Sequence, residues 1–247
     1  MGGRGQGRRV LRGADVSPSH RDSNADGVKS FFWIVDLAIH AVLWLLLASF
    51  LSVLVDVAAA HLLWRDDPID GIEALVRYYL GETTDPELAR HAADLAYWSW
   101  FGWTGVDASA RAWQAGTLPT QGLGSMLRPA FSGSTREALI VAMYGIKLFG
   151  IRFAMLVMTI PQFVLAVAVA FADGLVARHV RRAQGGHESA TRYHQAKHLL
   201  MFGVIPLGAV IWLLAPVPLP IYLHFWPVSL MTVIAVWNMA KYFKKYT

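Results

Sequence analysis

The stretch FFWIVDLAIHAVLWLLLASFLSVLVDV, residues 31–57, decides the class of fold to which this chain belongs. A helix that crosses the hydrocarbon core of a bilayer needs about 20 predominantly apolar residues, and this stretch exceeds that length. A buried helix of a soluble protein is the alternative interpretation, but such helices are rarely this long and this poor in charge. The stretch therefore predicts a transmembrane helix over residues 31–57.

The composition of the whole chain agrees with a membrane protein. Hydrophobic residues make up 55% of the 247 residues, the mean hydropathy is +0.40 and only 16% are charged, whereas about a quarter of the residues of a soluble domain are charged. The chain has no cysteine, which excludes disulfide bonds and cysteine-ligated metal sites. The net charge of +5 could favour nucleic acid, but the cations cluster beside apolar runs, as the positive-inside rule describes.

Three further apolar runs follow the first one. They cover residues 139–172, 199–215 and 222–240. Lys147 and Arg152 interrupt the start of the second run, and Pro161 predicts a kink within it. We therefore predict an all-α membrane protein with four transmembrane helices.

The distribution of charge predicts how these four spans are oriented. Six Lys/Arg precede the first span, five lie in the 173–198 loop and three follow the last span, whereas residues 58–138 contain six Arg, no Lys and ten Asp/Glu. Because cytoplasmic segments are enriched in Lys and Arg, we expect both termini in the cytoplasm of a bacterium and a multi-pass protein of its inner membrane. Residues 1–30 read as a disordered basic tail, and residues 241–247 as a second cytoplasmic tail.

The segment 58–138 is expected to be extracytoplasmic and helical. Asp85 is a candidate N-cap, with Pro86 at the first helical position. A dense aromatic group follows, and it favours either an interfacial belt or a packed face that binds a partner. The group consists of Tyr97, Trp98, Trp100, Phe101 and Trp103.

The basic loop DGLVARHVRRAQGGHESATRYHQAKH, residues 173–198, raises the question of a metal or nucleic-acid site. His194 and His198 share a helical face, but the pattern H-E-x-x-H that starts at His187 fails, because Thr191 stands where the second histidine is needed. The five cations could neutralise phosphates, yet any cytoplasmic loop carries such residues. We predict no metal, no cofactor and no direct nucleic-acid contact, and we expect anionic lipid headgroups as a partner.

The loop is expected to form a helical hairpin on the cytoplasmic face. The second span continues past the membrane, Gly185 and Gly186 break it, and a second helix starts near His187, with Glu188 complementing its dipole. No nucleophile–base pair, phosphate-binding loop or carboxylate dyad is visible elsewhere in the sequence. The sequence therefore predicts a protein that is not an enzyme.

The same stretch, with the apolar run and Pro161 before it, resembles a membrane-protein family of integrating conjugative elements and conjugative plasmids, catalogued as domain of unknown function 4400. The residues that carry the resemblance are Asp173, Gly174, Leu175, Arg178, Gly186, Glu188, Ser189, Tyr193, His194 and Lys197. His187 departs from it, because an Arg is more usual before the Glu. The resemblance extends from about Leu139 to Thr247 and is thin before that. It implies an inner-membrane component of a conjugative, type IV secretion-like DNA-transfer system near the coupling protein, and it implies no catalytic activity.

We therefore expect a non-enzymatic accessory subunit that docks or scaffolds other membrane proteins of the transfer machinery, as a monomer or an oligomer. The expected docking residues are Asp173, Arg178, Glu188, Arg192, Tyr193, His194 and Lys197. The rival interpretation is a small transporter or channel subunit, in which Asp36, His40, Lys147 and Arg152 would line a path. Against it, all four can be placed near the ends of spans. A metal-dependent membrane enzyme that uses His194 and His198 is the third interpretation.

Overall fold

The computed structural model describes residues 22–102, 104–108, 134–185 and 190–243, and the side chains of residues 22–34, 134–135 and 190 are left aside. These residues form helices, and no strand occurs among them, which confirms the all-α fold class. The elements are α1 (Asp22–Leu63), α2 (Pro68–Glu82), α3 (Pro86–Tyr97), the π-helix η1 (Trp98–Gly102), α6 (Ser134–Ala183), α7 (Ala190–His198), the π-helix η3 (Leu199–Val204), α8 (Ile205–Leu214) and α9 (Ile221–Tyr242).

Four of the helices are long and apolar enough to cross a membrane, as the sequence predicted. The candidate spans are Val35–Leu63, Arg136–Ala183, Thr191–Leu214 and Ile221–Tyr242. Each contains one of the predicted apolar runs or nearly all of it, and the second and third extend further into polar sequence. The side of the membrane on which each end lies stays a prediction.

The chain divides into two compact units, Met1–Leu45 and Leu46–Thr247. In the first unit α1 already begins at Asp22, within the predicted basic tail. Asp36 and His40 pair with each other there, with 3.3 Å between Nδ1 and Oδ1, and both are exposed. The apolar side chains between Val35 and Leu45 are exposed as well, which is typical of a helix whose surroundings are lipid.

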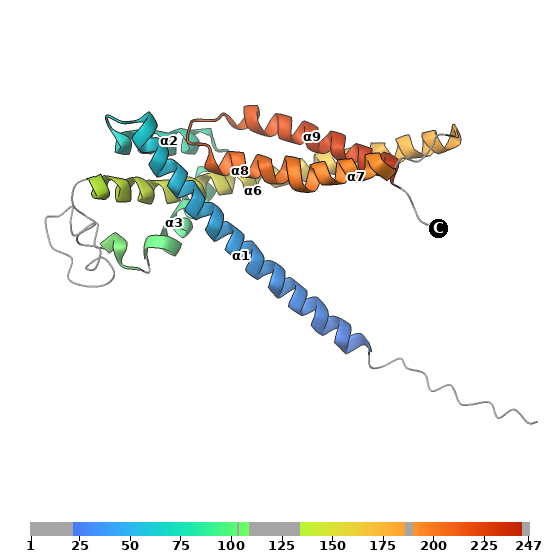
Figure 1. Cartoon of the computed structure of the whole chain (residues 1–247), viewed down its shortest axis with the longest axis horizontal. Helices are drawn as coiled ribbons and strands as arrows, with labels where there is room; N and C mark the ends of the chain where they lie inside the picture. The colour runs from blue at the N-terminus through green and yellow to red at the C-terminus, as the bar shows by residue number, and fades with distance from the viewer. Residues whose placement is uncertain (1–21, 103, 109–133, 186–189, 244–247) are drawn as a thin grey trace, which may run out of the picture. The chain divides into compact units, whose positions relative to one another are not determined.

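The second unit is organised along α6. Helices α2 and α3 pack on the first part of α6, and α8 and α9 pack along the later part (Figure 1). A Cβ atom at Gly150 would lie 2.5 Å from the carbonyl oxygen of Ala92, so α3 approaches α6 more closely here than any side chain would permit. Pro161 lies inside α6, which continues on both sides of it.

Helices α2 and α3 each begin with an aspartate N-cap followed by a proline. The Asp67 side chain accepts a hydrogen bond from the Asp70 amide, and the Asp85 side chain accepts one from the Leu88 amide, both at 3.0 Å. Pro68 and Pro86 occupy the first helical positions, where the missing N–H costs nothing. The predicted N-cap at Asp85 is therefore confirmed.

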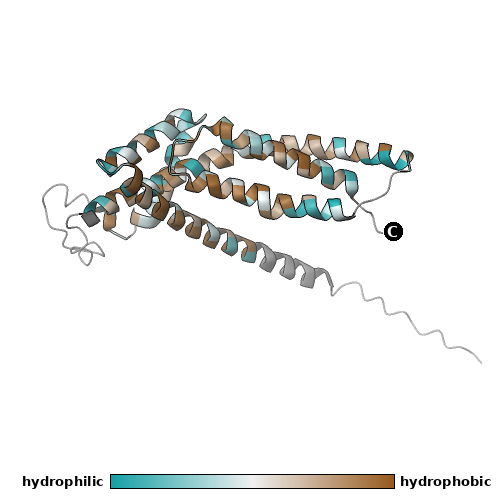
Figure 2. Cartoon of the chain, turned by 45° about the horizontal axis from the view of Figure 1, so that its top comes forward, coloured by the Kyte–Doolittle hydropathy of each residue, from teal (hydrophilic) through white to brown (hydrophobic). Residues whose placement is uncertain are grey.

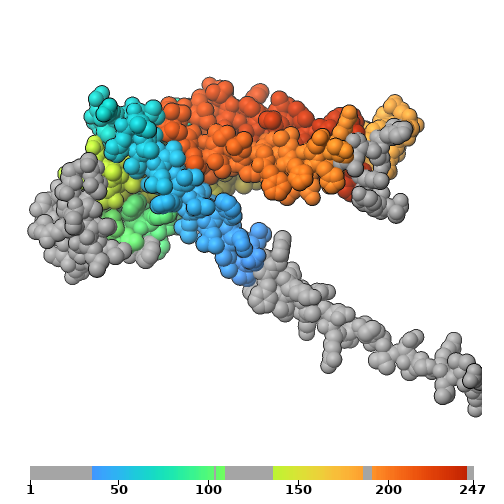
Figure 3. All heavy atoms as spheres, viewed as in Figure 1, coloured from blue at the N-terminus to red at the C-terminus, as the bar shows by residue number. Residues whose placement is uncertain are grey.

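Apolar and polar residues separate along the second unit. Figure 2 shows hydrophobic residues over the middle of α6, α8 and α9, with hydrophilic residues gathered at the end where α7 meets the C-terminal end of α9. Figure 3 shows α7 and α8 packed beside α9. The hydrophilic end contains most of the residues that the sequence singled out for docking.

Candidate functional site

Helices α6 and α9 touch at the start of the predicted cytoplasmic loop. A Cβ atom at Gly174 would lie 2.6 Å from the Cβ of Ala240 and 2.8 Å from the Trp237 carbonyl oxygen, so only glycine fits between the helices. Directly beside it, the indole Nε1 of Trp237 donates a hydrogen bond of 2.7 Å to Oδ2 of Asp173. Asp173 and Gly174 therefore fix the end of α9 against α6.

Cations from three helices surround the aromatic residues at the C-terminal end of α9. The guanidinium carbons of Arg181 and Arg192 lie 4.7 and 5.2 Å from the centre of the Tyr242 ring, and Nη1 of Arg192 is 2.5 Å from the Tyr242 hydroxyl oxygen. The ammonium of Lys241 lies 4.2 Å from the Trp237 ring centre, on its own helix. Such contacts stabilise by about 0.5–1 kcal/mol where the cation is exposed and by more where it is desolvated.

Arg178 adds a further guanidinium, 5.4 Å from the centre of the Phe243 ring. Its Nε and Nη2 atoms are buried and have no hydrogen-bond partner among the described residues. We name this assembly the basic–aromatic cluster. It consists of Asp173, Arg178, Arg181, Arg192, Trp237, Lys241, Tyr242 and Phe243.

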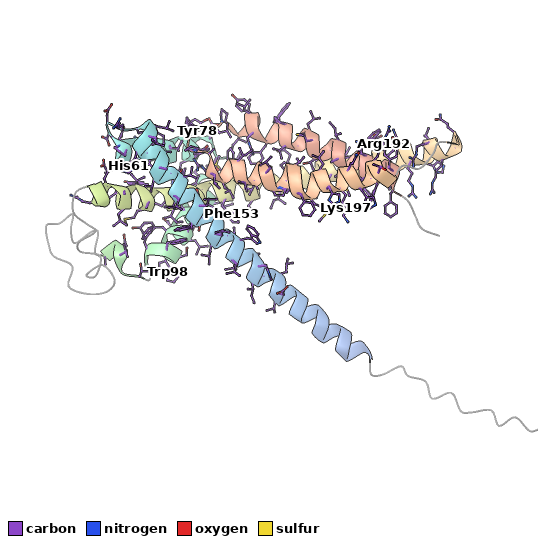
Figure 4. The ribbon with its side chains drawn as sticks, viewed as in Figure 1. His61, Tyr78, Trp98, Phe153, Arg192 and Lys197 are labelled. Carbon is purple, nitrogen blue, oxygen red and sulfur yellow. The ribbon has the colours of Figure 1, made fainter. Side chains whose placement is uncertain are left out.

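Helix α7 rests on the cluster with one face and exposes the other. The Tyr193 ring packs against the Phe243 ring with 5.8 Å between centres, and Ala196 is buried. His194 and Lys197 are exposed, and Figure 4 shows Lys197 and Arg192 on this helix, near the C-terminal end of α9.

The predicted docking residues therefore divide into two groups. Asp173, Arg178, Arg192 and Tyr193 contact the chain's own α9 or the residue after it, whereas His194 and Lys197 face outward. Glu188, Gly186 and the predicted helix start at His187 lie outside the described residues.

Metal ligands do not gather in this region. Among the residues that the structure describes, no group of three or more His, Asp or Glu side chains could hold a metal ion. The ring of His198 stacks on that of Phe202, with 5.7 Å between centres, and the His194 ring meets Tyr193 edge-on. These contacts are ordinary packing for aromatic rings.

A buried ion pair at the other end of the bundle was not predicted. Oδ1 of Asp56 on α1 lies 3.7 Å from Nη1 of Arg152 on α6, and both side chains have 0% exposure. Arg152 also donates hydrogen bonds to the carbonyl oxygens of Leu213, at 3.2 Å, and Ala215. These carbonyls are free because α8 ends at Leu214, and a cation there also complements the helix dipole.

Neighbouring side chains enclose this ion pair. The Tyr79 ring centre lies 4.9 Å from the Arg152 guanidinium carbon, and the Tyr79 hydroxyl joins the α8–α9 turn by donating to the Val217 carbonyl and accepting from the Leu219 amide, each at 3.1 Å. Ser52 donates its one hydroxyl hydrogen to the Leu213 carbonyl at 2.9 Å. Neither oxygen of Asp56 accepts a hydrogen bond from the described residues.

The sequence did contain a signal for this pair. Ser49, Ser52 and Asp56 follow one another at helical spacing within the first apolar run, so they form a polar stripe on one face. Polar stripes in transmembrane helices face the interior of the protein. Arg152 was expected near the end of its span, but it lies well inside the candidate span Arg136–Ala183, fully buried and paired with Asp56.

Two residues of the aromatic group at the end of α3 contact other helices of the second unit. The ammonium of Lys147 lies 4.6 Å from the centre of the Tyr97 ring. The Trp100 indole donates a hydrogen bond of 3.2 Å to the Ser49 hydroxyl. Trp98 is 61% exposed, and Trp103 lies outside the described residues. Tyr97 and Trp100 therefore contact the chain's own helices, and the interfacial belt and the partner-binding face stay predictions.

Comparison with known proteins identifies the family. A family model described as IncC plasmid conjugative DNA transfer protein DtrJ-like matches residues 73–244, from within α2 to just past the end of α9. No curated protein and no solved structure matches the chain. The match confirms the predicted membership in a conjugative-transfer family and reaches further towards the N-terminus than the predicted resemblance, whereas the assignment to domain of unknown function 4400 stays a prediction. The chain belongs to the DtrJ-like family of IncC plasmid conjugative DNA transfer proteins and takes part in conjugative DNA transfer.

Proposed function

We propose that the protein is a non-enzymatic subunit of the conjugative apparatus that holds other transfer proteins at the bacterial inner membrane. The docking surface is the exposed face of α7, with His194 and Lys197 at its centre. The observation that supports this proposal most directly is the anchoring of α7 by Tyr193, Ala196 and Arg192 on the end of α9. A short helix held in this way presents its outer face in one orientation.

A docking surface needs a fixed orientation, whereas a solvated loop does not need one. Binding orders side chains at a cost of about 0.5–1.5 kcal/mol each, and a surface that is already held avoids part of this cost. The outer face of α7 carries the cation of Lys197 and two histidines but no acidic residue among Ala190–His198. It is therefore complementary to an acidic surface on a cytoplasmic transfer protein, and the coupling protein is the partner that the family resemblance suggests.

The test replaces the outward-facing residues and leaves the anchor intact. His194→Gln together with Lys197→Gln should lower the frequency of DNA transfer about tenfold, since losing about 1.4 kcal/mol of binding corresponds to a factor of ten. Membrane insertion and protein level should stay normal, because both side chains are exposed. Arg192→Lys is a poorer test, because it would also disturb the contact with Tyr242.

The matched control is Arg77→Gln with His91→Gln, which removes a cation and a histidine from exposed positions on α2 and α3. A single cysteine at Lys197, in a chain that has none of its own, should crosslink to the partner in mating cells. Normal transfer by the α7 variant would disprove docking through this face.

A small transporter or channel subunit is the second candidate function. The observation that favours it is the Asp56–Arg152 pair, because ionisable residues inside transmembrane segments often mark transport pathways. The protein reconstituted in liposomes would then carry an ion or proton flux that Asp56→Asn abolishes. Absence of flux in the wild-type protein would remove this candidate.

A further inference from the structure

We propose that the basic–aromatic cluster binds the phosphodiester group of an anionic phospholipid. From Asp173 to Thr247 the sequence contains eight Lys/Arg and two acidic residues, Asp173 and Glu188. Asp173 already accepts a hydrogen bond from Trp237. Even if both carboxylates paired with cations, most of the cations would lack a counter-ion from this part of the chain. The excess of positive charge favours binding of an external anion.

The position of the cluster places it at the depth of lipid headgroups. Lys241 and Tyr242 are the last residues of the candidate span Ile221–Tyr242, and Trp237 lies about one turn before them. Indole rings prefer the membrane–water interface. The end of a span with a Trp, a Tyr and a Lys is therefore where lipid phosphates lie.

One face of α9 leads from the acyl chains to this headgroup region. Leu230 and Ile234 are 61% and 51% exposed, and Trp237 and Lys241 continue the same face at helical spacing. An acyl chain along the two apolar residues would bring its phosphate to the ammonium of Lys241. This arrangement matches a phospholipid, whose charge sits at the end of an apolar chain.

The cluster also supplies N–H groups that can donate hydrogen bonds to the oxygens of a phosphodiester. Nε and Nη2 of Arg178 have no hydrogen-bond partner among the described residues, and a buried donor that lacks a partner is destabilising. Guanidinium groups bind phosphate oxygens with two parallel N–H···O bonds. Arg192 is exposed, and Lys241 is half-buried. The cluster therefore combines a guanidinium whose buried donors have no acceptor among the described residues with cations that solvent or lipid can reach.

Duplex DNA is a poorer fit than a single lipid phosphate. DNA carries one negative charge per about 1.7 Å of its axis, so its sites are extended, exposed rows of cations. Here Arg178 and Lys241 are half-buried, and the neighbouring face of α9 is apolar. The proposal concerns a ligand of the membrane and does not depend on which transfer protein docks on α7.

The test measures lipid preference of the full chain in nanodiscs. The fraction of spin-labelled phosphatidylglycerol that the protein immobilises should exceed that of spin-labelled phosphatidylcholine. Arg178→Gln and Lys241→Gln should each lower this preference about fivefold, which is the attraction expected of one interfacial cation. The control variant, Arg77→Gln with Arg90→Gln, removes two exposed cations from α2 and α3 and should leave the preference unchanged.

Two outcomes would overturn the proposal. One is an unchanged preference in a folded Arg178→Gln/Lys241→Gln variant. The other is binding of a DNA oligonucleotide that competes with phosphatidylglycerol and is lost in the same variant, which would make the cluster a nucleic-acid site. If the double variant does not fold, Lys241→Gln alone decides, because the Lys241 ammonium lies over the Trp237 and Tyr242 rings of its own helix and joins no ion pair among the described residues.

Discussion

Replacement of Arg152 should destabilise the protein far more than replacement of its partner Asp56. Arg152→Met leaves the Asp56 carboxylate buried without a counter-ion and removes the donors to the Leu213 and Ala215 carbonyls. Breaking a buried ion pair by removing one member costs about 3–5 kcal/mol. For a chain of this size, that loss corresponds to a fall in Tm of about 10 °C.

Asp56→Asn should be much milder. Neither oxygen of Asp56 accepts a hydrogen bond from the described residues, and Arg152 keeps two carbonyl acceptors and the Tyr79 ring. We expect a loss of about 1 kcal/mol, comparable to one ordinary hydrogen bond. In the Arg152→Met background the same change should be stabilising, because it removes the uncompensated charge.

The double-mutant cycle therefore gives a signed result. Arg152→Met/Asp56→Asn should be more stable than Arg152→Met alone, with a coupling energy of about 2 kcal/mol, within the range for residues in contact. The assay is unfolding of the purified protein in mixed micelles, followed by the fluorescence of its ten tryptophans. Equal single effects that simply add in the double variant would refute the ion-pair reasoning.

Three further predictions concern the fold, the topology and the metal. Gly150→Ala should lower the Tm by several degrees, because its Cβ would lie 2.5 Å from the Ala92 carbonyl oxygen, whereas Gly81→Ala, with nothing within 4 Å, should be neutral or stabilising. Single cysteines at Ser17, Gly122, Gly185 and Thr247 report topology, because the chain has no cysteine of its own. An impermeant reagent added from outside should label only the Gly122 variant, and labelling of the Gly185 variant would contradict the four-span orientation. The purified protein should contain no stoichiometric zinc by elemental analysis, and His194→Ala with His198→Ala should leave the Tm nearly unchanged; one zinc per chain that this variant loses would restore the metal hypothesis.

The sequence predicted what depends on local composition. The four candidate spans follow from the lengths of the apolar runs, and the cap at Asp85 follows from an acidic residue directly before Pro86. In both cases the signal lies within a few turns of the residues it concerns. The five cations of the 173–198 loop likewise indicated that positive charge gathers in this region, which lies near the C-terminal end of α9.

The sequence did not predict which residues meet across helices. Arg178 and Arg192 appeared free to dock because Phe243 and Tyr242, which they contact, lie at the far end of another helix. The Asp56–Arg152 pair was missed for the same reason. Such contacts depend on the register and rotation of packed helices, which no local pattern specifies.

The length of α6 has a mechanical consequence. Its 50 residues, at 1.5 Å per residue, extend about 75 Å, more than twice the thickness of the hydrocarbon core. Pro161 lies between the Arg152 end and the Asp173 end of this rod, and it lacks the N–H that would bond to the Val157 carbonyl. A bend of about 10° at Pro161 would displace the Ala183 end, about 33 Å away, by about 6 Å. Pro161 is thus the point at which α6 bends most easily, and a force applied at its Ala183 end would be carried along the helix to the part on which α2 and α3 pack.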